Sequence, residues 1–193
     1  ILSAYCRDRG LKFGCTAHDV ESLPAIEAAK VDFVKLGARS DEATIDAVLA
    51  SELTVISSAP FPYGKAGRGT RLECVSAYPA PVEAQNISLL WERYDGRRTY
   101  DGFSDHTDPA LTWTGALAVA AGATIVEAHL RLDGTDEGNP DFPHAMSPVM
   151  FRDYVRHIRF AERCQQHRMA GVLLGMTKAA REEWITRHAE AVQ

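Results

Sequence analysis

The chain has 193 residues, of which 46% are hydrophobic and 24% charged, and its formal net charge at pH 7 is −5. This composition is typical of one globular domain with a sizeable core, while the acidic balance argues against a nucleic-acid partner and the apolar runs are too short to span a membrane. The four cysteines are scattered without a CxxC pair and no charged-then-apolar leader opens the sequence, so we expect a cytoplasmic protein with reduced thiols.

Short apolar segments rich in β-branched residues alternate with amphipathic stretches, as in βα units around a parallel sheet. In chain order this pattern predicts a strand at 11–16, a helix at 20–30, a strand at 32–37, a helix at 41–51 and strands at 53–58 and 71–78. It then predicts a short helix at 87–94, a strand at 100–105, a helix at 110–122, a strand at 123–132 and a long helix at 146–167 capped by Ser147. We therefore expect an α/β fold, an incomplete TIM-type (β/α) barrel of about six βα units over residues 1–170, followed by a helical C-terminal extension over 171–193.

Polar side chains recur near the carboxyl end of each predicted strand, which is where the active sites of parallel barrels lie. Because every second side chain of a strand faces inward, Glu127 and His129 share one face of the last strand, opposite its apolar residues. The same step of two pairs Ser104 with His106 and leaves Asp105 on the other face. The earlier strands contribute Thr16, Lys35, Ser57, Ser76 and Tyr78.

The strand-end residues divide into two chemical groups. An ammonium and four hydroxyls form a cradle suited to phosphate and carboxylate oxygens, supplied by Lys35, Thr16, Ser57, Ser76 and Ser104. His106 and His129, on adjacent strands, are close enough in a barrel to share a divalent metal such as Mn²⁺ or Zn²⁺ and to leave coordination positions open. Residues 133–141 are predicted to form an active-site lid, and four other histidines are expected in solvent on loops or helices: His144, His157, His167 and His188.

Three motifs, in this order, resemble the barrel of the N-acetylneuraminate (sialic acid) synthase family: "GFSDHT" at 102–107, "IVEAHLRLD" at 125–133 and "GNPDFPHAMSP" at 138–148. In that family the last strand reads like "VIEKHFTLD" and is followed by "PGPD". The segment "ECVSAYPAPVEAQNI" at 73–87 is similar to the family's "HCVSSYPTPxEDxNL". The resemblance covers residues 2–164 and implies that the chain matches family strands 3 to 8.

The family condenses phosphoenolpyruvate with an open-chain N-acylhexosamine to give a sialic acid and phosphate, a transferase reaction of the EC 2.5.1 type that uses a divalent metal. The resemblance implies that His106 and His129 bind this metal, with Mn²⁺ as the first candidate and Mg²⁺ or Zn²⁺ as alternatives. It implies that Glu127 orients groups of the site, and that the catalytic set is His106, His129, Glu127 and Lys35. It also implies contacts to phosphoenolpyruvate from Thr16, Lys35, Ser57 and Ser104, and to the aminosugar from Tyr78 and Asp141.

The sequence departs from the family pattern mainly in the anion-binding half. The first two βα units and the C-terminal antifreeze-like domain have no counterpart in these 193 residues, and residues 35–40 read "KLGARS" where the family has "KIxSGE". Ser76 stands where some members have asparagine. Either the full polypeptide is longer, or the chain is a divergent or fragmentary relative. Because six strands leave a barrel with two open edges, we expect pairing between chains, in a homodimer or larger oligomer, or a rearrangement to cover them. The alternatives are a different metal-dependent aldolase or lyase on the same barrel and a truncated relative without catalysis.

Overall fold

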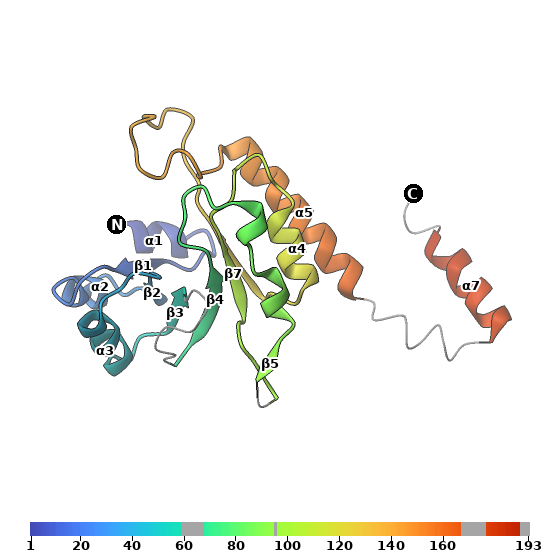
Figure 1. The fold of residues 1–193 in the computed structure, drawn as a ribbon, viewed down its shortest axis with the longest axis horizontal. Coiled ribbons are helices and arrows are strands. Elements are labelled where there is room, and N and C mark those ends of the chain that lie inside the picture. Colours follow the sequence, from blue (N-terminus) through green and yellow to red (C-terminus); the bar gives the residue numbers. More distant parts are fainter. Residues whose placement is uncertain (59–67, 95, 167–176, 190–193) are drawn as a thin grey trace.

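The computed structural model describes residues 1–58, 68–94, 96–166 and 177–189. Six parallel strands form one sheet in the order β1-β2-β3-β4-β7-β8. Their bounds are β1 Gly14–Ala17, β2 Phe33–Leu36, β3 Val55–Ser58, β4 Thr70–Cys74, β7 Gly102–Asp105 and β8 Ile125–Ala128. The helices are α1 Leu2–Arg7, α2 Leu23–Ala28, α3 Glu42–Ala50, α4 Thr114–Ala120, α5 Pro148–Gln166 and α7 Lys178–Ala189, with 3₁₀ helices η1 Val82–Ala84 and η2 Ile87–Leu90. Figure 1 shows α2 and α3 near the first strands, and α4 and α5 beside β7.

The sheet is strongly curled, as an incomplete barrel requires. In the strand order, β2 and β8 are four positions apart, which would separate them by about 19 Å if the sheet were flat. Nevertheless, the Lys35 ammonium on β2 lies 2.7 Å from a carboxylate oxygen of Glu127 on β8. The two ends of the sheet therefore turn toward each other, and the predicted incomplete (β/α) barrel is confirmed.

The two best-defined helix starts follow from local sequence. Asp41 precedes α3 and its carboxylate accepts a hydrogen bond from the backbone N–H of Thr44 at 2.7 Å, which satisfies one of the free donors of the first turn. Ser147 caps α5 in the same manner through the N–H of Met150, at 3.4 Å, and Pro148 takes the first helical position. The predicted cap of the long helix is confirmed.

Two hydrophobic clusters fix the helices against the convex face of the sheet. The first joins Val34 and Leu36 of β2 to residues of α2 and α3, and the second joins Phe103 of β7 to residues of η2 and α4. The helices α4 and α5 also pack closely. A Cβ added at Gly115 would lie only 2.5 Å from the Tyr154 hydroxyl. Only glycine at position 115 allows this approach, and it brings α5 near the carboxyl end of β7.

The region between β4 and β7 differs from the prediction. The helix predicted at 87–94 is only the short η2, and a hairpin of β5 (Arg93–Tyr94) and β6 (Arg97–Arg98) follows it. An Asp-Gly dipeptide at 95–96 is a strong hairpin signal, and Gly96 adopts a φ of 76° that suits glycine. In Figure 1 this hairpin lies at the end of the sheet opposite the loop that follows β8.

The edges and the C-terminal part leave some predictions open. Within the described residues, β1 and β8 each have one neighbouring strand, so the two predicted open edges are present there. The predicted covering of these edges stays a prediction. The predicted helical extension over residues 171–193, to which α7 belongs, also stays a prediction. Residues 59–67, which follow β3, lie outside the described part of the chain. In the part of the chain that the structure describes, no helix combines the length and the apolar character needed to cross a bilayer.

Glu73 gives a stability prediction, because its side chain is fully buried on the convex face of β4. Burial raises the pKa of this carboxyl above its ordinary value of 4.5, although Asn86 donates a hydrogen bond to Oε1 at 3.2 Å. The folded chain therefore binds this proton more tightly than the unfolded chain, and the free energy of unfolding falls as pH rises from 4.5 through the raised folded-state value. We expect Glu73→Gln to remove this decline.

The measurement is urea unfolding of the wild type and Glu73→Gln across the pH range from acid to neutral. Glu83→Gln, which changes an exposed carboxyl on η1, is the matched control. Parallel pH profiles for the wild type and Glu73→Gln would contradict the assignment.

Candidate functional site

The strand register decides which strand-end side chains share the concave face of the curled sheet. Thr16 pairs with Lys35 across β1 and β2, so both point the same way. At the other end of the sheet, Cys74, Ser104 and Glu127 occupy one register row across β4, β7 and β8. Since Lys35 and Glu127 form an ion pair, the two rows face each other across the concave side.

Ser57 does not lie on this face, which corrects the prediction from the sequence. It pairs with Leu36, whose side chain belongs to the convex hydrophobic cluster, whereas its neighbour Ser58 pairs with Leu72 of the concave face. The Ser58 hydroxyl is buried and has no hydrogen-bond partner among the described residues. Ser58 therefore takes the position at the concave face that the sequence assigned to Ser57.

Lys35 and Glu127 form the charged pair of the concave face. The ammonium donates to Oε1 at 2.9 Å and lies 2.7 Å from Oε2, while the Lys35 side chain is 12% exposed. Thr16, Lys35 and Glu127 line a cavity of about 370 Å³ whose remaining lining is largely apolar. A buried ammonium needs an anionic partner, and the chain itself supplies one in Glu127.

His106 is held in a defined tautomer at the end of β7. Its Nδ1 lies 2.9 Å from the carbonyl oxygen of Val75, and only a protonated nitrogen can donate to a carbonyl. Nε2 therefore keeps its lone pair, 3.4 Å from the Ser104 hydroxyl. Burial lowers the pKa of His106, an effect that the hydrogen bond to Val75 opposes. A neutral imidazole with a free Nε2 is the form that binds metals.

The predicted partners of His106 lie beside it. The ring centroids of His106 and His129 are 5.3 Å apart, and the Tyr78 ring lies 4.5 Å from that of His106. Ser76 is adjacent, with its hydroxyl buried and without a hydrogen-bond partner in the described part of the chain. The rings of His106, His129 and Tyr78 therefore lie close together at this end of the sheet, and the roles assigned to these residues stay predictions.

The loop after β8 returns to the same place and adds two residues to it. The backbone of Met146 pairs with the segment that directly follows β8: its N–H donates to the carbonyl of His129 at 2.9 Å, and its carbonyl accepts from the N–H of Arg131 at 2.9 Å. This pairing brings Asp141 to 3.4 Å from Nδ1 of His129. It also places His144 with its ring 4.4 Å from that of His129.

His144 was predicted to be solvated, and this was wrong. Its side chain is 3% exposed, packed between His129 and Tyr78. Burial lowers the pKa of His144, and the neighbouring His129 acts in the same direction. The prediction failed because the sequence around a histidine in a polar loop does not indicate burial. The burial of His144 depends on the pairing of Met146 with the segment after β8. The other predicted solvent histidine with a described environment, His157, is half-buried and stacks on Trp113.

Asp105 faces the convex side, as predicted, and anchors the end of β7. Its Oδ1 accepts from the backbone N–H and the hydroxyl of Thr107, at 3.0 and 2.7 Å. Its Oδ2 accepts from the hydroxyls of Thr114 on α4 and, at 2.7 Å, Tyr154 on α5. This network positions the strand end that carries His106.

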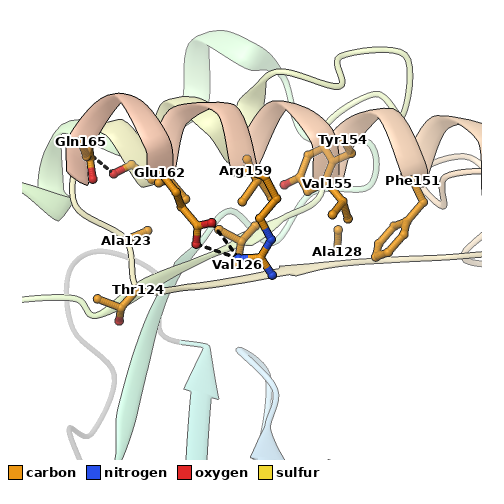
Figure 2. Close-up of a pocket in the computed structure, with 12 residues that line it drawn as sticks. Ala123, Thr124, Val126, Ala128, Phe151, Tyr154, Val155, Arg159, Glu162 and Gln165 are labelled. Atoms are coloured by element: carbon orange, nitrogen blue, oxygen red, sulfur yellow. Dashed lines mark hydrogen bonds and ion pairs between the residues drawn. The ribbon is translucent and has the colours of Figure 1, made fainter. Parts of the chain in front are cut away.

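A second pocket lies on the convex side, between β8 and α5. Figure 2 shows Val126 and Ala128 of β8 beneath α5, opposite Phe151 and Val155. This confirms the predicted direction of the apolar side chains within β8. Leu130, which the alternation also assigned to this side, lies beyond the strand and is exposed. The pocket, of about 830 Å³, is separate from the histidines.

A curled parallel sheet with polar residues gathered at the carboxyl ends of its strands defines an α/β protein of the (β/α)-barrel type. The profile of the NeuB family matches residues 63–169, more than half of the 193 residues, and the chain therefore belongs to the NeuB family.

Three proteins illustrate the relationship. The N,N'-diacetyllegionaminic acid synthase of Legionella pneumophila is 36% identical over 91 residues, which are 47% of this chain and 25% of the relative. The N-acetylneuraminate-9-phosphate synthase of Homo sapiens is 33% identical over 97 residues, or 48% of this chain and 25% of the relative. The matched stretch thus spans a quarter of each relative. The crystal structure of the N-acetylneuraminic acid (sialic acid) synthetase of Leptospira borgpetersenii, 22% identical, superposes with a TM-score of 0.77 over 97% of this chain and 68% of that one, which establishes the fold.

Proposed function

We propose that this chain carries the site of a sugar-acid synthase that condenses phosphoenolpyruvate with an N-acylhexosamine, such as N-acetylmannosamine, and releases phosphate. The observation that carries the proposal is the convergence of His106 and His129 at the same concave face as the Lys35–Glu127 pair. The names of the Legionella and human relatives, both sugar-acid synthases, support the same class of product.

The histidine pair suits a divalent metal, for which Mn²⁺ is the first candidate and Mg²⁺ and Zn²⁺ are alternatives. The fit rests on His106, because its Nδ1 is committed to Val75 and its Nε2 keeps a lone pair. A bound divalent cation would supply Lewis-acid polarisation of the sugar aldehyde.

The other residues of the site would bind and orient the two substrates. Lys35, beside Thr16, suits the carboxylate or phosphate of phosphoenolpyruvate, and Glu127 orients the ammonium. Tyr78, half exposed beside the histidines, offers a ring on which a sugar can pack. The carbon–carbon bond forms between the methylene carbon of phosphoenolpyruvate and the aldehyde carbon, water adds to the central carbon, and phosphate leaves.

One observation favours a second candidate. Residues 35–40 read "KLGARS" where the family has "KIxSGE", so the anion-binding half lacks the serine and the glutamate of that motif. A metal-dependent aldolase or lyase acting on a smaller aldehyde or keto acid needs fewer such groups. A non-catalytic relative would differ from both candidates by showing neither turnover nor metal binding.

The proposal is tested by measuring phosphate release from phosphoenolpyruvate by the purified protein, with N-acetylmannosamine and related aminosugars and with added Mn²⁺. Release is expected to require both substrates. Lys35→Met is expected to raise the KM for phosphoenolpyruvate by about 10–100-fold, because a charge-assisted hydrogen bond contributes about 1.5–3 kcal/mol.

Lys35→Arg keeps the charge and is the matched variant, expected to recover part of the loss. No release with any aminosugar, but turnover of a small keto acid, would favour the second candidate. An unchanged KM in Lys35→Met would contradict the role given to the ammonium.

A further inference from the structure

The loop after β8 brings a second set of potential metal ligands to the histidine pair. Nδ1 of His129 lies 3.4 Å from Oδ2 of Asp141, and Nε2 of His144 lies 3.7 Å from Oδ1 of the same carboxylate. One ligand atom from each of these three residues lies within 4.8 Å of the others. Ligands bound to one ion at about 2.1 Å are roughly 3.0–3.5 Å apart, so the measured separations are close to those of a shared cation.

The environment of His144 gives an independent indication. The side chain is 97% buried, at 3% exposure, yet neither ring nitrogen has a hydrogen-bond partner within the described residues. A buried polar group without a partner is destabilising, and native structures rarely keep one without a reason. The ring borders His129 and Tyr78, so its free nitrogens lie in the site and not in the hydrophobic core.

The three imidazole rings are also arranged as around one ion. Their centroids are 4.4 Å apart for His129 and His144, 5.3 Å for His106 and His129, and 6.0 Å for His106 and His144. Imidazoles that share an ion at a metal–nitrogen distance of about 2.1 Å place their centroids roughly 4.5–6 Å apart. His129 and His144 each have a ligand atom in the group that lies within 4.8 Å, and the His106 ring borders that group.

We propose that Asp141 and His144, both on the loop after β8, are metal ligands that complete a centre with His106 and His129. This inference rests on the proposed function and enlarges its ligand set from two residues to four. Three imidazoles and one carboxylate favour Zn²⁺, Co²⁺ or Mn²⁺ over Mg²⁺, which prefers oxygen ligands. Because Asp141 is 61% exposed while His144 is buried, binding of the cation would fix the exposed part of the loop against β8.

The test is calorimetric titration of the chelator-treated full protein with Zn²⁺ and Mn²⁺. One equivalent is expected to bind, and Asp141→Asn and His144→Gln are each expected to weaken binding by about 10²-fold or more, since even groups that only orient a metal ligand contribute 10–100-fold. Asp141 lies on the surface, so Asp141→Asn keeps the proposal testable if His144→Gln fails to fold. Glu137→Gln removes one charge from the same loop and is expected to bind like the wild type.

A spectroscopic readout separates ligation from a general electrostatic effect. The visible absorption of Co²⁺ bound to the protein reports on its ligands, so the spectrum is expected to change in His144→Gln and to stay unchanged in Glu137→Gln. Wild-type affinity and an unchanged Co²⁺ spectrum in both Asp141→Asn and His144→Gln would overturn the proposal.

The outcomes also separate this proposal from the proposed function. If the wild type releases phosphate and these two variants bind metal normally, the four-ligand centre is wrong and the synthase proposal stands. If the variants lose the metal but no aminosugar supports phosphate release by the wild type, the four-ligand centre stands and the synthase proposal falls.

Discussion

Replacement of Asp105 by alanine is expected to lower the free energy of unfolding by about 3–5 kcal/mol, because a hydrogen bond to a charged group contributes about 1.5–3 kcal/mol and several are lost together. The carboxylate is 3% exposed and accepts four hydrogen bonds, from the backbone and hydroxyl of Thr107 and from the hydroxyls of Thr114 and Tyr154. Alanine would leave all four donors buried without this acceptor. Each unsatisfied donor costs about 1–3 kcal/mol before the structure relaxes.

Tyr154→Phe removes one of these donors and is expected to cost about 1–2 kcal/mol. Burial and the adjacent Asp105 carboxylate raise the pKa of Tyr154 well above its ordinary value, so the phenol stays protonated and donates throughout the accessible pH range. Asp153→Ala, on the same helix, breaks only exposed ion pairs with Arg152 and Arg156 and is expected to cost less than about 1 kcal/mol.

Urea unfolding of Asp105→Ala, Tyr154→Phe and Asp153→Ala measures these differences directly. A double-mutant cycle between Asp105→Asn and Tyr154→Phe is expected to show coupling, because the two side chains share a hydrogen bond. An Asp105→Ala protein as stable as Asp153→Ala would show that the network contributes nothing to the fold.

The alternation of side chains along strands predicted much of this arrangement. In "GFSDHT" it separated His106 from Asp105 correctly, because apolar Phe103 marks the convex face beyond doubt. It failed in "VISS", where two adjacent serines follow the apolar residues and give no contrast between the faces. A slip of one residue therefore assigned to Ser57 the position on the concave face that Ser58 occupies.

Contacts between distant segments were beyond the reach of local patterns. The requirement for an anion near Lys35 was predictable from burial, but its identity was not, because Glu127 is 92 residues away in sequence and meets it only through the curl of the sheet. His144 was missed for a related reason, since a backbone pairing between the loop and the segment after β8 determines its burial. Both contacts depend on how distant segments meet in the curled sheet, which no single βα unit encodes.

The largest effect on activity is expected from His106→Ala. This variant lacks the imidazole whose tautomer is fixed by the carbonyl of Val75. It therefore lacks Nε2, one ligand of the proposed metal. A Lewis acid contributes several kcal/mol of transition-state stabilisation, so kcat/KM for phosphate release is expected to fall by about 10³-fold or more. His157→Ala removes a histidine on α5 whose ring contacts Thr112 and Trp113, and is the matched control.

The Mn²⁺ concentration that the variant requires, together with its rate at saturating Mn²⁺, distinguishes a metal ligand from a residue that only supports the fold. If His106 only supports the fold, His106→Ala lowers stability while the active fraction keeps the wild-type response to Mn²⁺. If it binds the metal, the variant is folded by circular dichroism, needs a much higher Mn²⁺ concentration, and recovers only part of its rate at saturation. Among the described residues, the His106 side chain bonds the backbone only at Val75, whereas Asp105 links β7 to α4 and α5, so the second outcome is expected. Wild-type rates at ordinary Mn²⁺ concentrations would place the metal elsewhere.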